Sequence, residues 1–154
     1  MWARSVRIKI LSEEGKDAAN VKIRYFHKDN LGRIEAQTIL PNGKKIKLNG
    51  KQIFEESVKN YYKQKVFAIP GVEVGSVIEY KYKLSSEYLQ MLEPWYFQNE
   101  YYTKLSKVSV SILPGFHYNA FQRNIFGAEA VPTEEDFIIP SATAKRGKAF
   151  TWEN

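Results

Sequence analysis

The segment Val77–Leu84, VIEYKYKL, alternates strictly between two sets of positions. One set is apolar throughout and consists of Ile78, Tyr80, Tyr82 and Leu84. Successive side chains of a β-strand point to opposite faces, so the segment predicts a strand with one buried face. Two aromatic and two aliphatic side chains on the same face identify that face as the core side.

The same alternation recurs along the chain, at residues 6–10, 21–25, 33–40, 45–48 and 105–113, and residues 116–121 predict a further strand. Glycine and proline signals separate these runs at intervals of about 8–12 residues, as in sandwiches and barrels. No run alternates with a long helical pattern, which argues against a parallel α/β fold. The sequence therefore predicts an all-β protein, an antiparallel β-sandwich of about nine or ten short strands with room for one short helical turn.

Three connections have a distinctive local composition. Pro41-Asn42-Gly43 lies between two extended runs, and Asn-Gly there predicts a hairpin because both residues accept positive φ. Residues 12–20 are polar and contain Gly15, and residues 124–135 are polar and end in acidic side chains, so both predict loops. Residues 51–60 fit a helical face poorly and predict extended structure, and the helical turn is expected either here or in the connection at residues 85–93.

The chain has 154 residues, of which 44% are hydrophobic and 26% are charged. This length and composition are typical of one globular domain with one core, and no linker or internal repeat divides it. No apolar run approaches the ~18 residues of a membrane span. We therefore expect a single domain over residues 1–154 and no transmembrane segment.

The residues give no positive signal for catalysis, a metal or a cofactor. The absence of cysteine removes thiol nucleophiles and disulfides, and the two histidines are His27 and His117. Residues 134–136, Glu-Glu-Asp, are typical of a solvated acidic turn rather than of a calcium loop. Gly-x-Ser-x-Gly and glycine-rich phosphate loops are absent. A stand-alone hydrolase would need a cleft that joins His117 or His27 to a serine and an acid.

The charge is unevenly distributed. Residues 1–65 carry 15 Lys and Arg against 7 Asp and Glu, whereas residues 66–154 carry 8 against 10. Such asymmetry indicates either an anionic partner for the first half or a solvated strand face, because the lysines alternate with apolar residues. No compact basic run is present, and we do not expect binding to nucleic acid.

Aromatic side chains are concentrated after Pro94. Alternate members of such a run point to opposite faces, so about half are expected in the core. The outward members are candidates for an interaction surface, since aromatic side chains anchor interfaces. The candidate residues are Trp95, Tyr96, Phe97, Tyr101 and Tyr102. A carbohydrate-binding module that stacks sugars on surface aromatics is an alternative use of the same residues.

Four stretches together carry a resemblance to a known family. They are residues 7–15 (RIKILSEEG), residues 38–43 (TILPNG), residues 70–82 (PGVEVGSVIEYKY) and residues 95–98 (WYFQ) with the strand that ends at Pro114. These residues resemble the domain of unknown function found N-terminal to transglutaminase-like domains in bacterial envelope proteins. The resemblance covers nearly the whole chain, and residues 70–82 are its most specific part.

The resemblance implies a β-sandwich, broadly immunoglobulin-like, that is not itself an enzyme. It implies an accessory or interaction domain beside a transglutaminase-like domain with a Cys-His-Asp centre, in the bacterial periplasm or cell envelope. The absence of cysteine agrees, because this chain cannot perform that thiol chemistry. Compared with the family pattern, a signal peptide, the first strands and the enzyme domain are absent, so we expect the chain to be a fragment.

Overall fold

The computed structural model describes residues 1–87, 94–112, 133–138 and 146–153. The chain divides into two compact units, Met1–Met91 and Leu92–Asn154, which are described separately. All strand pairs in both units are antiparallel. The all-β, antiparallel, sandwich-like fold predicted from the sequence is confirmed, while a single domain over residues 1–154 stays a prediction.

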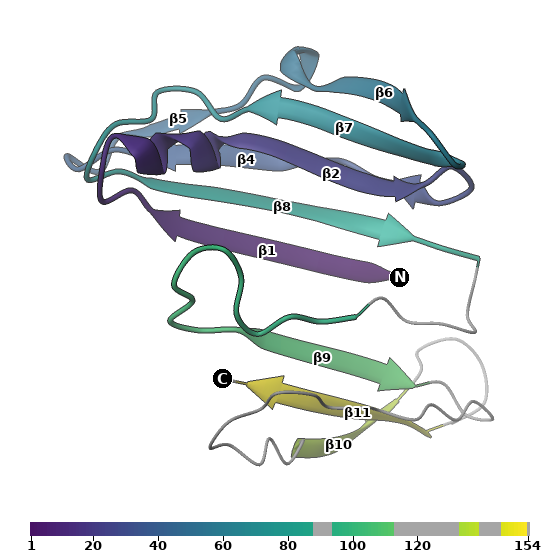
Figure 1. Cartoon of the computed structure of the whole chain (residues 1–154). Coiled ribbons are helices and arrows are strands. Elements are labelled where there is room, and N and C mark those ends of the chain that lie inside the picture. Colours follow the sequence, from purple (N-terminus) through teal and green to yellow (C-terminus); the bar gives the residue numbers. More distant parts are fainter. Residues whose placement is uncertain (88–93, 113–132, 139–145, 154) are drawn as a thin grey trace. The chain divides into compact units, whose positions relative to one another are not determined.

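The first unit contains a five-stranded sheet with the order β1–β8–β4–β5, in which β3 also pairs with β8 (Figure 1). The central strand β8 contains the alternating segment from which the fold was predicted. On one side β8 pairs with β1. On its other side β8 pairs with β4 along its first half and with β3 at its end. The strands are β1 (Trp2–Lys9), β3 (Asn30–Leu31), β4 (Glu35–Ile39), β5 (Lys45–Lys47) and β8 (Val77–Ser85).

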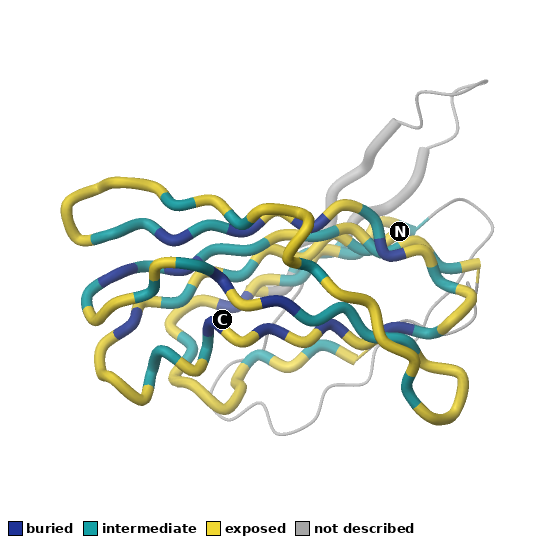
Figure 2. Tube along the Cα trace, turned by 90° about the horizontal axis from the view of Figure 1, so that it is seen from above, coloured by how far each residue is buried: buried dark blue, intermediate teal, exposed yellow. Residues whose placement is uncertain are grey.

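A second sheet of the first unit has the order β2–β7–β6. Its strands are β2 (Asn20–Phe26), β6 (Phe54–Val58) and β7 (Tyr62–Ala68). Buried positions alternate with exposed ones along β2, as a half-buried strand requires. Figure 2 shows buried, intermediate and exposed residues along the whole described trace. The inward residues of β2 are Val21, Ile23 and Tyr25, each less than a tenth exposed.

The core of the first unit lies between its two sheets. Ile78 of β8 is 0% exposed and packs in one cluster with Val21 and Ile23 of β2 and Phe67 of β7. The rings of Phe67 and Tyr80 meet edge to face across the sheets, with centroids 6.3 Å apart. The inward face of β8 is therefore the one that its sequence predicts.

The connection between β7 and β8, residues 69–76, is a loop that depends on two glycines. Gly71 and Gly75 have φ of 69° and 90°, in the left-handed region that glycine adopts without a Cβ clash. The buried Ser76 hydroxyl donates to the Glu73 carbonyl oxygen at 2.6 Å, and the Thr38 hydroxyl donates to the Pro70 carbonyl oxygen at 2.6 Å. These contacts explain why residues 70–76 form a specific sequence pattern.

Two short 3-10 helices interrupt the strands, η1 (Glu14–Ala19) and η2 (Gly50–Gln52). Residues 12–20 were predicted to form a loop, and this prediction is wrong for η1, where Ala19 is buried in the core. The helical turn predicted within residues 51–60 is confirmed as η2. It begins at a capping box, in which the Asn49 side chain accepts from a backbone N–H and Gln52 reaches back to the Asn49 N–H.

The predicted Asn-Gly hairpin is confirmed. Strands β4 and β5 pair across residues 40–44, and Gly43 has φ of 83°. The Gly43 N–H donates to the Leu40 carbonyl oxygen at 2.8 Å, which closes the turn. Asn42 supports it by accepting from the Lys44 N–H.

The second unit contains a three-stranded sheet with the order β10–β11–β9. Its strands are β9 (Lys107–Ile112), β10 (Thr133–Ile138) and β11 (Arg146–Glu153). Residues 134–136 lie in β10, so the predictions of an acidic turn there and of a loop up to residue 135 are wrong. A further strand predicted at residues 116–121 lies outside the described residues. Among the described residues, no helix is long and apolar enough to cross a membrane.

Candidate functional site

The aromatic segment predicted as an interaction surface lies in the second unit, between residues 94 and 102. Tyr96 and Tyr102 are 67% and 91% exposed, and Tyr101 is also exposed. Trp95 and Phe97 are only partly exposed. Three tyrosines are therefore exposed and two side chains are partly covered. The expected alternation into the core is not seen, because the adjacent Tyr101 and Tyr102 are both exposed and none of the five candidate residues is buried.

Trp95 anchors this segment to the strand that follows it. Its indole N–H donates to the Ser106 hydroxyl at 3.0 Å, and Ser106 is itself buried next to the start of β9. The Gln98 amide donates to the Thr103 carbonyl oxygen at 3.2 Å, which holds the intervening turn. These bonds fix the backbone from which Tyr96, Tyr101 and Tyr102 project, so the exposed rings are presented on an ordered turn.

The two histidines considered for a hydrolase do not form a described catalytic site. His27 is exposed, and its Nδ1 lies 2.9 Å from the Tyr61 carbonyl oxygen. His117 lies outside the described residues. Near His27, the Phe26 and Tyr62 rings meet at 77° and the His27 and Tyr61 rings at 37°. Within the described residues, no group of three metal-ligating side chains could hold a metal ion.

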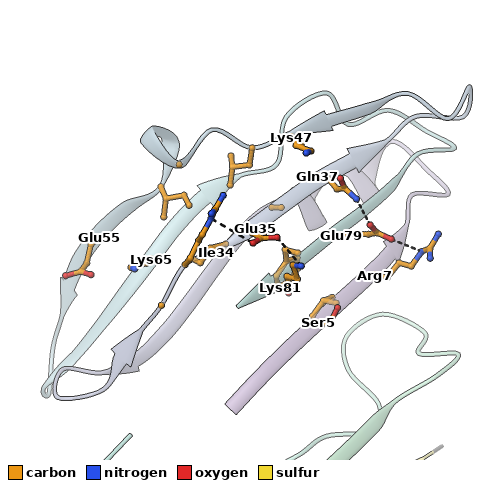
Figure 3. Close-up of a pocket in the computed structure, with 18 residues that line it drawn as sticks. Ser5, Arg7, Ile34, Glu35, Gln37, Lys47, Glu55, Lys65, Glu79 and Lys81 are labelled. Carbon is orange, nitrogen blue, oxygen red and sulfur yellow. Dashed lines mark hydrogen bonds and ion pairs between the residues drawn. The ribbon is translucent and has the colours of Figure 1, made fainter. Parts of the chain in front are cut away.

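A second feature is a groove of about 840 Å³ on the first unit. Its lining includes outward side chains of β1, β8, β4 and β5 and residues of η2, β6 and β7 (Figure 3). It also includes Val6, Ala36 and Tyr80, which the register places on the inward face. The close-up shows Arg7, Glu79 and Gln37 in one row and Lys81 and Glu35 in the next. Ile34, Leu48 and Ile53 are apolar members of the lining.

Charged side chains cross-link the strands below this groove. Glu79 accepts a hydrogen bond from the Gln37 amide at 2.8 Å and pairs with Arg7, whose Nε lies 3.3 Å from its carboxylate. Glu35 pairs with Lys81 at 3.0 Å, and the hydrogen bond and charge of Lys81 hold the pKa of Glu35 below its ordinary value. Each pair lies directly across from its partner in the strand register, which is where opposite charges stabilise a sheet.

A polar contact joins β2 and β6 of the second sheet beside the core. The Tyr25 hydroxyl donates to the Glu55 carboxylate at 2.5 Å, and the Lys63 ammonium lies 3.1 Å from the other carboxylate oxygen. The hydrogen bonds from Tyr25 and then Lys63 lower the pKa of Glu55. Burial first, and then Glu55, raise the pKa of Tyr25.

These two shifts predict a pH dependence of stability with two limbs. The pKa of Glu55 is lower in the folded state than its ordinary value of 4.5. The ionised Glu55 therefore stabilises the fold above pH 4.5, and this stabilisation is lost as the pH falls. The pKa of Tyr25 is higher in the folded state than its ordinary value of 10.0. The protonated Tyr25 therefore stabilises the fold below pH 10.0, and this stabilisation is lost as the pH rises. Urea unfolding of wild type and Tyr25→Phe at pH 3, 7 and 11 should show a flatter profile for the variant. An equal slope in both proteins would contradict this role of the pair.

Sequence reasoning located the aromatic segment but did not locate the groove. The alternation of lysines with apolar residues indicated a solvated strand face, but it did not show which strands share that face. The signal was present in Arg7, Lys47 and Lys81, which line the groove from outward positions of three separate alternating runs. Only the strand order places these runs in one sheet.

Comparison with known proteins supports the reading of the fold. A family model of a domain of unknown function with a solved structure, DUF3857, matches residues 2–151. No curated protein matches the sequence significantly. A crystal structure from Parabacteroides distasonis, described as a "putative protease", is similar with a TM-score of 0.65 and 16% identity. At this identity, the similarity shows a shared fold alone.

The match to that structure is unequal in length. It covers 99% of this chain but 31% of the Parabacteroides distasonis chain, so this chain spans less than a third of that protein. The family model, in contrast, covers nearly all of this chain. The resemblance noted from residues 70–82 and the other three stretches is thereby confirmed, and the chain belongs to the DUF3857 family of domains of unknown function.

Proposed function

We propose that this chain is a non-catalytic accessory domain of a larger bacterial envelope protein that also contains a transglutaminase-like or peptidase domain. The observation that supports this most strongly is the coverage of 99% of this chain but only 31% of the Parabacteroides distasonis protein. A domain that recurs as one part of a longer protein is suited to positioning or regulating another part. The absence of cysteine supports a non-catalytic role, because the thiol nucleophile of a transglutaminase-like centre would have to belong to another domain.

The proposed docking surface is formed by the exposed rings of Tyr96, Tyr101 and Tyr102. Large aromatic side chains bury much area at a low cost in conformational entropy, and they dominate the binding energy of many interfaces. The hydrogen bond between Trp95 and Ser106 orders this segment before binding, which lowers the entropy lost on docking. The partner is the adjacent enzyme domain, and the location is the periplasm or the cell envelope.

The first test is to sequence the gene on both sides of the region that encodes this chain. An open reading frame that continues into a domain with a Cys-His-Asp centre would support the proposal. A stop codon directly after Asn154 would contradict it. The purified 154-residue chain should also show no peptidase or transamidase activity on casein, and turnover that survives purification would overturn the non-catalytic assignment.

The docking surface gives a quantitative prediction. The double variant Tyr96→Ser/Tyr102→Ser should bind the separately produced enzyme domain about tenfold more weakly in isothermal titration calorimetry, because it removes two aromatic anchors. Its thermal unfolding temperature should be unchanged, since both rings are exposed.

Tyr61→Ser is the matched control, because Tyr61 is an exposed tyrosine of the first unit. It should leave the affinity for the enzyme domain unchanged. An equal loss of affinity in Tyr61→Ser and in the double variant would place the docking surface elsewhere. A lower unfolding temperature of the double variant would instead identify Tyr96 or Tyr102 as a structural residue.

A further inference from the structure

We propose that the outward face of the five-stranded sheet binds an extended acidic polypeptide segment whose carboxylates occupy alternate positions. The groove in Figure 3 covers part of this face, with Arg7, Lys47 and Lys81 in its lining, and the whole face lies within the first unit. The inference concerns the first unit by itself. It therefore holds or fails independently of docking through Tyr96 and Tyr102.

The strand register gathers a net positive charge on this one face. Its strands carry six cations and two carboxylates at outward positions, a balance of +4 in a chain whose formal net charge is +6. A surface with one predominant sign of charge attracts ligands of the opposite sign. The cations are Arg7, Lys9, Lys45, Lys47, Lys81 and Lys83.

The two carboxylates of the face are already occupied. Glu79 is held by Arg7 and Gln37, and Glu35 is held by Lys81. In contrast, Lys45, Lys47 and Lys83 are exposed and form no ion pair within the part of the chain that the structure describes. These three ammonium groups can bind carboxylates of a ligand without breaking an ion pair that already exists within the chain.

The spacing of the cations favours an extended chain. They occur as three pairs two residues apart along a strand: Arg7 with Lys9, Lys45 with Lys47, and Lys81 with Lys83. Such pairs repeat at roughly 6.7 Å, the same interval at which an extended peptide presents alternate side chains on one face. An acidic strand with carboxylates at alternate positions therefore matches the cations in both charge and spacing.

Two other occupants fit less well. A single-stranded nucleic acid is normally held by aromatic side chains on which its bases stack, and the outward positions of β1, β4, β5 and β8 contain none. A second copy of the chain would bring two cationic faces together, and like charges repel. The structure thus favours an acidic polypeptide over both.

The test uses the 154-residue chain and a fluorescein-labelled decapeptide of alternating Glu and Thr. Fluorescence anisotropy at 50 mM salt should show saturable binding that weakens at 300 mM salt, because salt screens exposed charges. The triple variant Lys45→Gln/Lys47→Gln/Lys83→Gln should bind about tenfold more weakly, since three ion pairs of modest energy are lost.

The matched control is Lys22→Gln/Lys28→Gln/Lys59→Gln, which removes the same charge from exposed positions outside this sheet. It should change the affinity less than twofold. Equal weakening in both triple variants would show that net charge, rather than this face, attracts the peptide. Absence of binding at 50 mM salt, or tighter binding of a ten-residue oligothymidine, would overturn the proposal. Circular dichroism of both variants should match wild type, because none of the six lysines is buried.

Discussion

Replacing Ile78 with Ala should lower the free energy of unfolding by about 2–5 kcal/mol, the largest effect expected of a single substitution in this protein. Ile78 is 0% exposed and lies in the central strand β8, between β1 and β4. The substitution removes three buried carbon atoms and leaves a cavity in the core between the two sheets, because the packed neighbours of a buried side chain relax only partly into the space. Urea unfolding followed by tryptophan fluorescence and circular dichroism measures the change.

A graded series tests whether packing is the cause. Ile78→Val removes one methylene group and should cost about 0.5–1.5 kcal/mol. Val77→Ala is the matched control, because Val77 precedes Ile78 in the same strand and points to the opposite, partly exposed face. It should cost less than Ile78→Ala. If Val77→Ala and Ile78→Ala cost the same, strand propensity rather than burial would explain the loss.

Replacing Gly71 with Ala should give the second large effect, a loss of about 1–2 kcal/mol for the left-handed backbone and a further loss from a steric clash. Gly71 has φ of 69°, and a Cβ built there would lie 2.4 Å from Cδ1 of Ile46. The side chain of Ile46 must then move away from the β7–β8 loop. The loop positions β8 next to its partners, so the same urea unfolding assay reports the loss.

Two variants separate the backbone cost from the clash. Gly43→Ala has a similar φ of 83°, and a Cβ there would meet no heavy atom within 4 Å, so it measures the backbone cost alone. Gly71→Ala combined with Ile46→Val removes the clashing Cδ1 atom and should recover part of the loss. If Gly71→Ala costs no more than Gly43→Ala, the clash with Ile46 is relieved without cost.

Local patterns predicted much of the secondary structure. The alternation in Val77–Leu84 predicted both the strand β8 and its buried face, because strand periodicity is a property of neighbouring residues. Asn42-Gly43 predicted the hairpin, since the turn requires backbone conformations that these residues adopt readily. The prediction was wrong for residues 14–19, where the burial of Ala19 against the core stabilises a 3-10 helix within a polar segment.

The sequence by itself determined the all-β class and the inward side chains of the main strands. These features depend on alternation, which is encoded within a few consecutive residues. Only the tertiary structure decided that β1, β8, β4 and β5 are neighbours, and hence that Arg7, Lys81 and Lys47 share one face with Glu35 and Glu79. Strand order depends on how distant segments bury their apolar faces together, and that long-range packing is not visible in any local pattern.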